Sequence, residues 1–135
     1  MKSILAIAMV MVLIGNPLTA AGQEKVSVAT MPPVVVKTEP QSGDIKVDPK
    51  MKEIRVTFSK KMMDKSMSWS TVSEDTTPES TGEPKYLADG KTCVLPVKLQ
   101  PKKTYAFWLN SQKFGNFKDT KGQSAVPYLL IFETK

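Results

Sequence analysis

The sequence predicts an all-β protein, an antiparallel β-sandwich of about seven strands, in a chain of 135 residues. The clearest apolar pattern alternates with a period of two: in residues 52–59, Ile54, Val56 and Phe58 fall on one face and polar residues on the other. Short apolar stretches recur along the chain between turn-forming Pro, Gly, Asp and Ser residues. No long segment shows a helical period, so a sandwich of short strands fits the pattern best.

Residues 1–21 have the layout of a secretory signal peptide. Lys2 gives a basic start, residues 4–14 form an unbroken apolar run, and small residues follow, so that cleavage after Ala20 or Ala21 fits. The run is shorter than the roughly 20 residues that a membrane-spanning helix needs. We therefore expect an exported protein, periplasmic or extracellular, with no stable membrane anchor after cleavage.

The rest of the chain is expected to form a short linker, residues 22–32, and one domain, residues 33–135. Its apolar stretches predict the strands in order: residues 33–40, a short strand within 45–49, then 52–59, 66–72, 92–99, 104–110 and 126–134. Residues 73–84 are polar, carry Pro and Gly, and predict a loop. Pro96 predicts that its strand lies at a sheet edge or contains a bulge, because proline donates no ladder hydrogen bond.

The stretch "TYAFWLN" (104–110) predicts which side chains face the core. Alternation places Tyr105, Phe107 and Leu109 together and leaves Trp108 on the opposite face. Leu99, Pro101 and Tyr105 also have the spacing of a tyrosine corner, in which the hydroxyl bonds to upstream backbone in Greek-key sandwiches.

Taken in order, the segments "VVKTEPQSGDIKVDPKMKEIRVTFSKKMM", "LADGKTCVLPVKLQPKKTYAFWLN" and "FKDTKGQSAVPYLLIFET" resemble the bacterial Ig-like domain of the SbsA type. The positions that carry the resemblance are Pro40, Gly43, Val47, Pro49, Ile54, Val56, Phe58, Ser59, Met62, Leu99, Pro101, Tyr105, Asp119, Gly122, Phe132 and Thr134. The resemblance implies an Ig-like Greek-key sandwich that acts outside the cytoplasm without catalysis, as a spacer or a binding unit.

Composition removes several classes of function. The chain has no histidine and a single cysteine, Cys93, so the commonest general base and histidine-dependent triads are absent, and we expect no enzyme and no cofactor. Cys93 lies among alternating apolar residues and is expected to be a small core residue.

The net charge of +6 comes almost entirely from lysine, with Arg55 the only arginine, so nucleic-acid binding is not expected. We expect a monomer.

The stretch "FSKKMMDKSMSW" (58–69) offers an alternative, a periplasmic Cu(I)-binding protein. Its thioethers, Met62, Met63 and Met67, with the indole of Trp69, are soft groups of the kind that bind Cu(I). CopC-like copper proteins are small sandwiches of this kind, but their copper histidines have no counterpart here, and flanking lysines oppose a cation. The same methionines also suit an irregular gap at the end of a core.

The main candidate for function is a binding surface. Trp108 points away from the core face of its strand, and Phe114 and Phe117 follow it with Lys113 and Lys118. Exposed aromatic rings beside lysines are suited to stacking on a sugar or to gripping a protein. We therefore predict a binding module for an envelope polysaccharide or protein. A further alternative is an accessory domain that acts with a partner enzyme.

Overall fold

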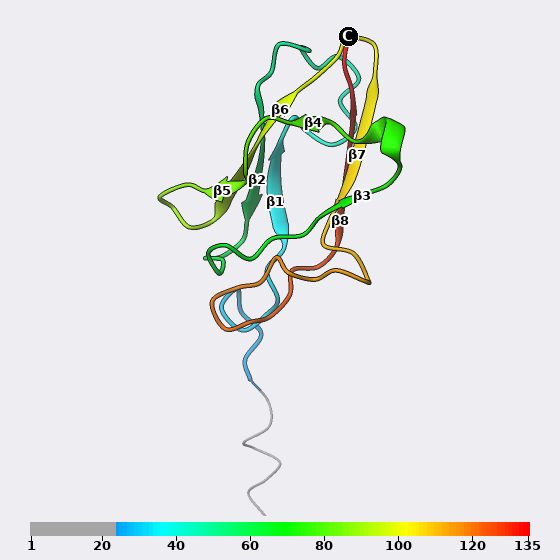
Figure 1. The fold of residues 1–135 in the computed structure, drawn as a ribbon. Coiled ribbons are helices and arrows are strands. Elements are labelled where there is room, and N and C mark those ends of the chain that lie inside the picture. The colour runs from blue at the N-terminus through cyan, green and yellow to red at the C-terminus, as the bar shows by residue number, and fades with distance from the viewer. Residues whose placement is uncertain (1–23) are drawn as a thin grey trace, which may run out of the picture.

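The computed structural model describes residues 24–135, which form two antiparallel sheets packed face to face. Figure 1 shows the two layers, with the N-terminal segment leaving at one end and the C-terminus at the other. One sheet has the order β1-β2-β6-β4 with β5 also paired to β6, and the other has the order β3-β7-β8. The strands are β1 Val35–Glu39, β2 Glu53–Phe58, β3 Trp69–Thr71, β4 Glu79–Ser80, β5 Lys85–Tyr86, β6 Thr92–Lys98, β7 Thr104–Leu109 and β8 Tyr128–Glu133.

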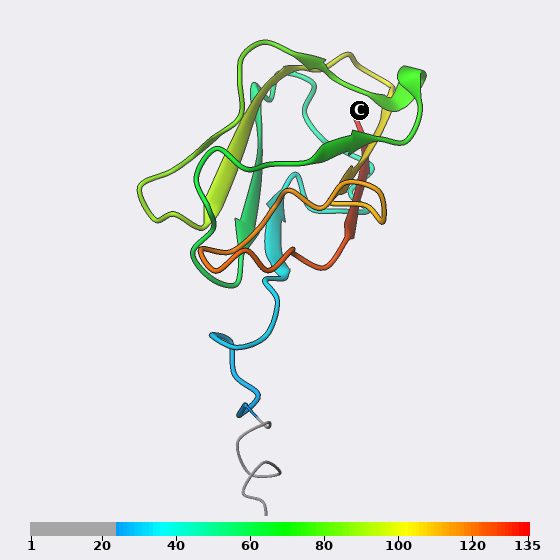
Figure 2. The same cartoon turned by 60° about the horizontal axis from the view of Figure 1, so that its bottom comes forward.

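The predicted fold class is confirmed. The chain passes between the sheets three times, after β2, after β3 and after β6. As a result β2 and β6 are neighbours although three strands separate them in sequence. Figure 2 shows the long segment between β2 and β6 running across the open side of the sandwich. Such crossings between sheets are typical of Ig-like sandwiches.

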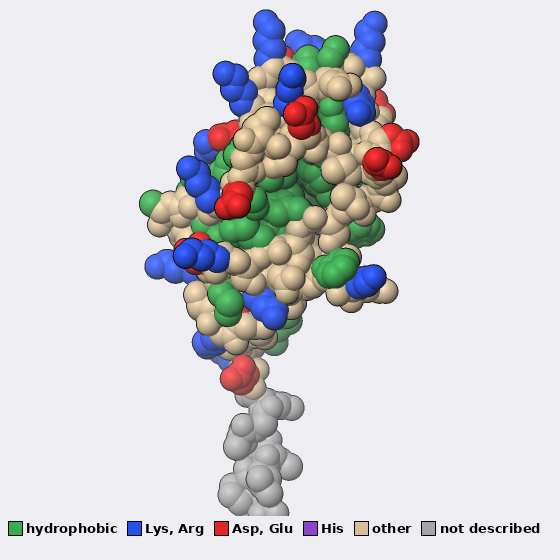
Figure 3. Space-filling view, viewed as in Figure 1, with side chains coloured by type: hydrophobic (Ala, Val, Ile, Leu, Met, Phe, Trp, Pro, Cys, Tyr) green, Lys and Arg blue, Asp and Glu red, His purple; other side chains and the backbone are tan. Residues whose placement is uncertain are grey.

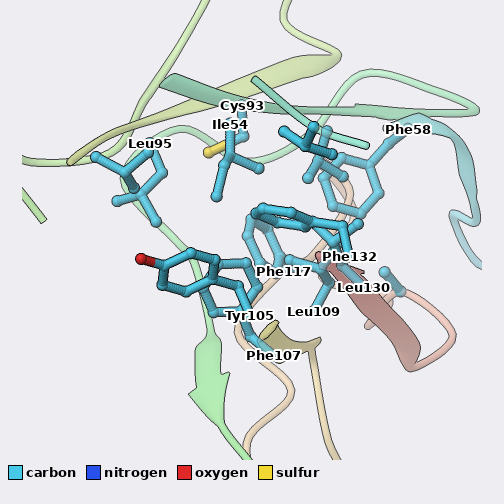
Figure 4. Close-up of a cluster of buried hydrophobic side chains, with 14 of the residues drawn as sticks. Ile54, Phe58, Cys93, Leu95, Tyr105, Phe107, Leu109, Phe117, Leu130 and Phe132 are labelled. Carbon is cyan, nitrogen blue, oxygen red and sulfur yellow. The ribbon is translucent and has the colours of Figure 1, made fainter. Parts of the chain in front are cut away.

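The core lies between the sheets and follows the predicted alternation. Ile54, Val56 and Phe58 of β2 are buried, as are Tyr105, Phe107 and Leu109 of β7. Figure 4 shows the side chains of the two sheets meeting, with aromatic rings from β7 and β8 packed beneath Ile54 and Cys93. A sequence that alternates with a period of two thus buries one face of each strand and exposes the other.

The tyrosine corner is also confirmed. The hydroxyl of Tyr105 accepts a hydrogen bond of 2.8 Å from the backbone N–H of Gln100. The ring of Tyr105 packs on Phe132, with the two centroids 5.6 Å apart. The corner therefore ties the turn before β7 to the last strand of the same sheet.

Three predictions about strands were wrong. No strand forms within residues 45–49, where Val47 makes only an isolated β-bridge to Thr134. Pro96 lies in β6, which is central in its sheet, between β2 and the pair β4 and β5. The proline is tolerated because the ladder on that side is interrupted: β5 pairs with residues 93 and 94 and β4 with residues 97 and 98. Between these pairs the Pro96 carbonyl still accepts a hydrogen bond of 3.1 Å from the N–H of Thr81. The segment 73–84 is more than a loop, because it contains a 3₁₀ turn at Glu74–Thr76, the strand β4 and a buried proline, Pro78.

The predicted signal peptide lies outside the described residues, and so does the start of the predicted linker. The described part of that linker contacts the sandwich: the ammonium of Lys60 donates to the carbonyls of Ala29 and Met31 at 2.8 and 3.0 Å. The amide of Gln123 donates to the carbonyl of Thr30 at 3.3 Å. Within residues 24–135, none of the helical segments has the length and apolar character to cross a membrane.

Candidate functional site

The candidate site begins with Trp108 on the outer face of the three-stranded sheet. Trp108 pairs with Ser70 of β3 on one side and with Leu129 of β8 on the other. Because its neighbours in β7 face the core, the indole faces outward, and 38% of the residue is exposed. The alternation predicted from sequence thus gives the correct face for this residue.

The loop that follows β7 brings a second aromatic ring to the same place. Phe114 is 50% exposed, and the Lys113 ammonium lies 5.4 Å from the centroid of its ring, within cation–π distance. Two hydrogen bonds close the turn: the N–H of Ser111 donates to the Phe114 carbonyl at 2.8 Å, and the N–H of Phe114 donates to the Ser111 hydroxyl at 3.1 Å. The turn holds Phe114 and Lys113 beside the sheet face.

Trp108, Ser111 and Lys113 line two adjoining grooves. The first, of about 510 Å³, is lined by residues of β3 and of the loop: Met67, Ser68, Trp69, Ser70, Thr71, Trp108, Ser111, Lys113, Phe114 and Asn116. The second, of about 450 Å³, is lined by Trp108, Ser111, Gln112, Lys113 and Pro127. The first groove has three aromatic side chains and the second has one, and both add hydroxyl and amide groups and a single lysine. We call this pair of grooves the Trp108 surface.

Asn110 fixes the loop to the sandwich. Its side-chain amide donates to the carbonyls of Phe117 and Ala125 at 2.9 and 3.0 Å and accepts from the N–H of Phe117 at 2.8 Å. The residue is buried and has a positive φ of 59°, a conformation that asparagine tolerates better than most residues. Sequence reasoning did not select Asn110, although an asparagine directly after a strand is a recognisable turn signal.

The prediction that Phe117 belongs to the binding surface was wrong. Phe117 is fully buried, with its ring centroid 5.0 Å from that of Phe58 and 5.7 Å from that of Trp69. It anchors the base of the loop in the core. Lys118 is half-buried and does not line either groove, so of the five predicted residues the structure brings together Trp108, Lys113 and Phe114.

A third hollow opens on the side of the sandwich where β5 and β3 are the sheet edges. Figure 3 shows apolar side chains gathered there inside a rim of charged residues. A groove of about 730 Å³ on this side is lined by Asp64, Lys65, Met67, Glu83, Pro84, Lys85 and Tyr86. The Tyr86 hydroxyl is buried without a hydrogen-bond partner, and burial raises the pKa of this tyrosine. Met67 lines both this groove and the first groove of the Trp108 surface.

The four groups of the Cu(I) alternative lie in different environments. Met62 is buried in the core, whereas the adjacent Met63 is 38% exposed. Met67 and Trp69 are half-buried and line the first groove. Because neighbouring residues of an extended segment point to opposite sides, Met62 and Met63 do not share a site. The structure therefore fits the core-filling interpretation of Met62.

Cys93 is a core residue, as predicted. It is fully buried on β6, and burial raises the pKa of its thiol to about 12, an effect that the neighbouring Trp69 indole partly opposes. A thiol held in this state is a poor nucleophile. Among the described residues, no group of three or more acidic, cysteine or histidine side chains is arranged to hold a metal ion.

Comparison with known families identifies the domain. The sequence model of a family described as a bacterial Ig-like domain matches residues 29–134, beginning within the predicted linker. The chain belongs to this family. Comparison with curated proteins finds no match.

Two solved structures resemble this bacterial Ig-like domain. One is the surface layer protein SbsC, domains 1-6, with a TM-score of 0.50 and 20% identity over 77% of this chain and 14% of that chain. The other is the S-layer protein rSbsC(31-844), with a TM-score of 0.51 and 19% identity over 79% of this chain and 14% of that chain. At this identity the likeness shows the fold, and the chain spans about one seventh of the length of each.

Within this bacterial Ig-like domain, several positions that carry the resemblance are structural. The Asp119 carboxylate accepts from the backbone N–H groups of Lys121 and Gln123 at 3.0 and 2.9 Å, and it pairs with the Lys60 ammonium at 2.8 Å. Burial opposes ionisation of Asp119, but these hydrogen bonds outweigh it and lower the pKa of the carboxyl. Met62 pairs with Asp119 across a β-bridge and fills the core beneath it.

Proposed function

We propose that this protein is an exported, non-catalytic Ig-like module that binds a linear polysaccharide of the cell envelope at the Trp108 surface. The observation that carries the proposal is the position of Trp108, an indole on the outer face of a sheet that lines two grooves at once. An indole in this position offers an exposed ring face for stacking.

The lining of the grooves supports a sugar as ligand. Sugar rings present apolar C–H faces, which stack on aromatic rings, and hydroxyl groups, which need hydrogen-bond partners. The Trp108 surface supplies the rings of Trp108 and Phe114 and, beside them, the polar side chains of Ser70, Gln112 and Asn116. An obligate protein interface would present a more uniformly apolar centre.

The arrangement also favours a chain over a single sugar. Because the two grooves share Trp108, a linear polymer that stacks one ring on the indole can place neighbouring sugars in both grooves. Lys113 lines both grooves and carries their only formal charge, which suits an acidic or N-acetylated polymer with carboxylate groups. The family and the likeness to surface-layer proteins support a location at the cell envelope.

Co-sedimentation with purified peptidoglycan, together with affinity electrophoresis in gels that contain soluble acidic polysaccharide, tests the proposal. We expect the wild-type protein to bind and Trp108→Ala to bind at least about tenfold more weakly, since a central aromatic anchor contributes 1–2 kcal/mol or more. Phe114→Ala should weaken binding less, because its ring lines one groove only.

Ile131→Ala is the matched control. Ile131 is an exposed apolar residue, 40% accessible, in the neighbouring strand of the same sheet, and it lines neither groove. Equal binding by Trp108→Ala and the wild type would refute the proposal, and so would equal losses in Trp108→Ala and Ile131→Ala. Binding of a protein partner at Trp108 without any polysaccharide binding would also refute the proposal, because the ligand of the surface would then be a protein.

A further inference from the structure

The two ends of the sandwich differ in charge. The end next to the described N-terminal segment is built from residues 24–34, 59–66, 87–91 and 110–127, which hold eight lysines and four acidic residues. The opposite end, built from residues 40–52, 72–81, 98–103 and 134–135, holds seven lysines and five acidic residues. Figure 3 shows Lys and Arg side chains at both ends of the domain, so the difference lies in the balance of charges.

A groove of about 480 Å³ at the N-terminal end concentrates this charge. It is lined by Val28, Ala29, Ser59, Lys60, Lys61, Lys91, Asp119, Thr120 and Lys121. The ammonium of Lys60 and the carboxylate of Asp119 neutralise each other inside it. Lys61, Lys91 and Lys121 are exposed, and within residues 24–135 none of the three forms an ion pair. Three lysines without ion pairs therefore surround one groove, and the nearby Asp89 carboxylate partly offsets the charge of Lys91.

Aliphatic side chains stand exposed beside these lysines. Val26, Val28 and Met31 are 76%, 65% and 47% exposed. They are presented by a turn in which the N–H groups of Thr30 and Met31 donate to the carbonyl of Ser27 at 3.2 and 3.0 Å. Lys60 holds this turn against the sandwich through its bonds to the carbonyls of Ala29 and Met31. The valines are thus held in place on a fixed turn, next to the basic groove.

We propose that this end of the domain docks on the surface of an anionic phospholipid bilayer. Lysines near an anionic bilayer are attracted by its surface potential, and exposed aliphatic residues beside them enter the boundary between headgroups and acyl chains. Lys61, Lys91 and Lys121 bind lipid phosphates, and Val26 and Val28 insert between the headgroups. The docking surface is separate from the Trp108 surface, with which it shares no lining residue.

The exposed valines decide between a bilayer and a soluble polyanion. A phosphate-bearing polymer in solution gains from the lysines alone, whereas a bilayer gains also from the aliphatic side chains. Two classes of variant therefore separate the two sources of phosphate: lysine variants weaken binding to both, and valine variants weaken binding to the bilayer only.

Vesicle co-sedimentation of the chain from residue 24 onward provides the test, with phosphatidylglycerol–phosphatidylcholine vesicles, pure phosphatidylcholine vesicles and soluble polyphosphate as probes. We expect binding to the anionic vesicles at low salt and little binding to phosphatidylcholine. The triple variant Lys61→Gln, Lys91→Gln, Lys121→Gln should bind about a hundredfold more weakly, since each lysine near an anionic surface contributes roughly fivefold. Val26→Ser, Val28→Ser should lose vesicle binding but keep polyphosphate binding.

Lys46→Gln, Lys50→Gln, Lys102→Gln is the matched control, because it removes three exposed lysines from the opposite end. All of these side chains are exposed, and circular dichroism verifies that each variant folds. Equal losses in the two triple variants would overturn the proposal, as would absence of binding to anionic vesicles at low salt. Binding to polyphosphate that exceeds binding to vesicles and is unaffected by the valine substitutions would also overturn it.

Discussion

Replacement of Asn110 tests how the loop of the Trp108 surface is held. Asn110→Ala removes three side-chain hydrogen bonds of 2.8 to 3.0 Å and leaves backbone groups of Phe117 and Ala125 without those partners. Each bond contributes about 1 kcal/mol, and alanine at a φ of 59° costs about 1 kcal/mol more. We therefore expect the free energy of unfolding to fall by about 4 kcal/mol, a large part of the 5–15 kcal/mol typical of a domain.

Asn110→Gly separates the two contributions. Glycine adopts a positive φ without steric cost but makes no side-chain hydrogen bond, so we expect a loss of about 3 kcal/mol. Urea denaturation followed by far-ultraviolet circular dichroism measures both variants, and the glycine variant stays informative if the alanine variant does not fold. A loss below about 1 kcal/mol in Asn110→Gly would show that the three hydrogen bonds do not hold the loop.

Three further predictions concern stability. Phe117→Ala should lower the free energy of unfolding by about 4 kcal/mol, whereas Phe114→Ala should change it by less than about 1 kcal/mol, because only Phe117 is buried; equal effects in urea denaturation would contradict these positions. Tyr105→Phe should cost about 1 kcal/mol through loss of the tyrosine-corner hydrogen bond, and an unchanged denaturation midpoint would argue against that bond. The folded pKa of Asp119 is lowered, so the stabilisation that its carboxylate provides is complete above the unfolded pKa of about 3.9 and is lost as the pH falls through the folded pKa. Below about pH 4, the free energy of unfolding should therefore fall less steeply with decreasing pH in Asp119→Asn than in the wild type. Equal slopes of the free energy of unfolding against pH in the two proteins would contradict this role of Asp119.

Much of the fold can be predicted from the sequence because burial follows local alternation. The period of two in β2 and β7 identifies their core faces, and the same rule places Trp108 on the outer face. The prediction for Pro96 was wrong because its strand is central in the sheet. A proline is tolerated there because strand pairing has a gap between β4 and β5. That gap depends on the path of residues 79–86, which no local pattern reveals.

The candidate site was predicted only in part, for a similar reason. Phe114 and Phe117 lie in one loop with no regular period, so the sequence does not indicate which ring enters the core. The structure assigns that role to Phe117 because Phe58 and Trp69, distant in sequence, form its pocket. The basic groove likewise joins segments far apart in the chain, from Val28 to Lys121.

Tryptophan fluorescence of a Trp69→Phe variant tests the central claim most directly. The chain has two tryptophans, so this variant leaves Trp108 as the only indole, and 38% of that residue is exposed to solvent. If the Trp108 surface binds a linear envelope polysaccharide, added polysaccharide should shift the emission to shorter wavelength and protect the indole from acrylamide quenching. Polysaccharide binding that sediments the protein but leaves both the emission and the quenching of Trp108 unchanged would contradict the account.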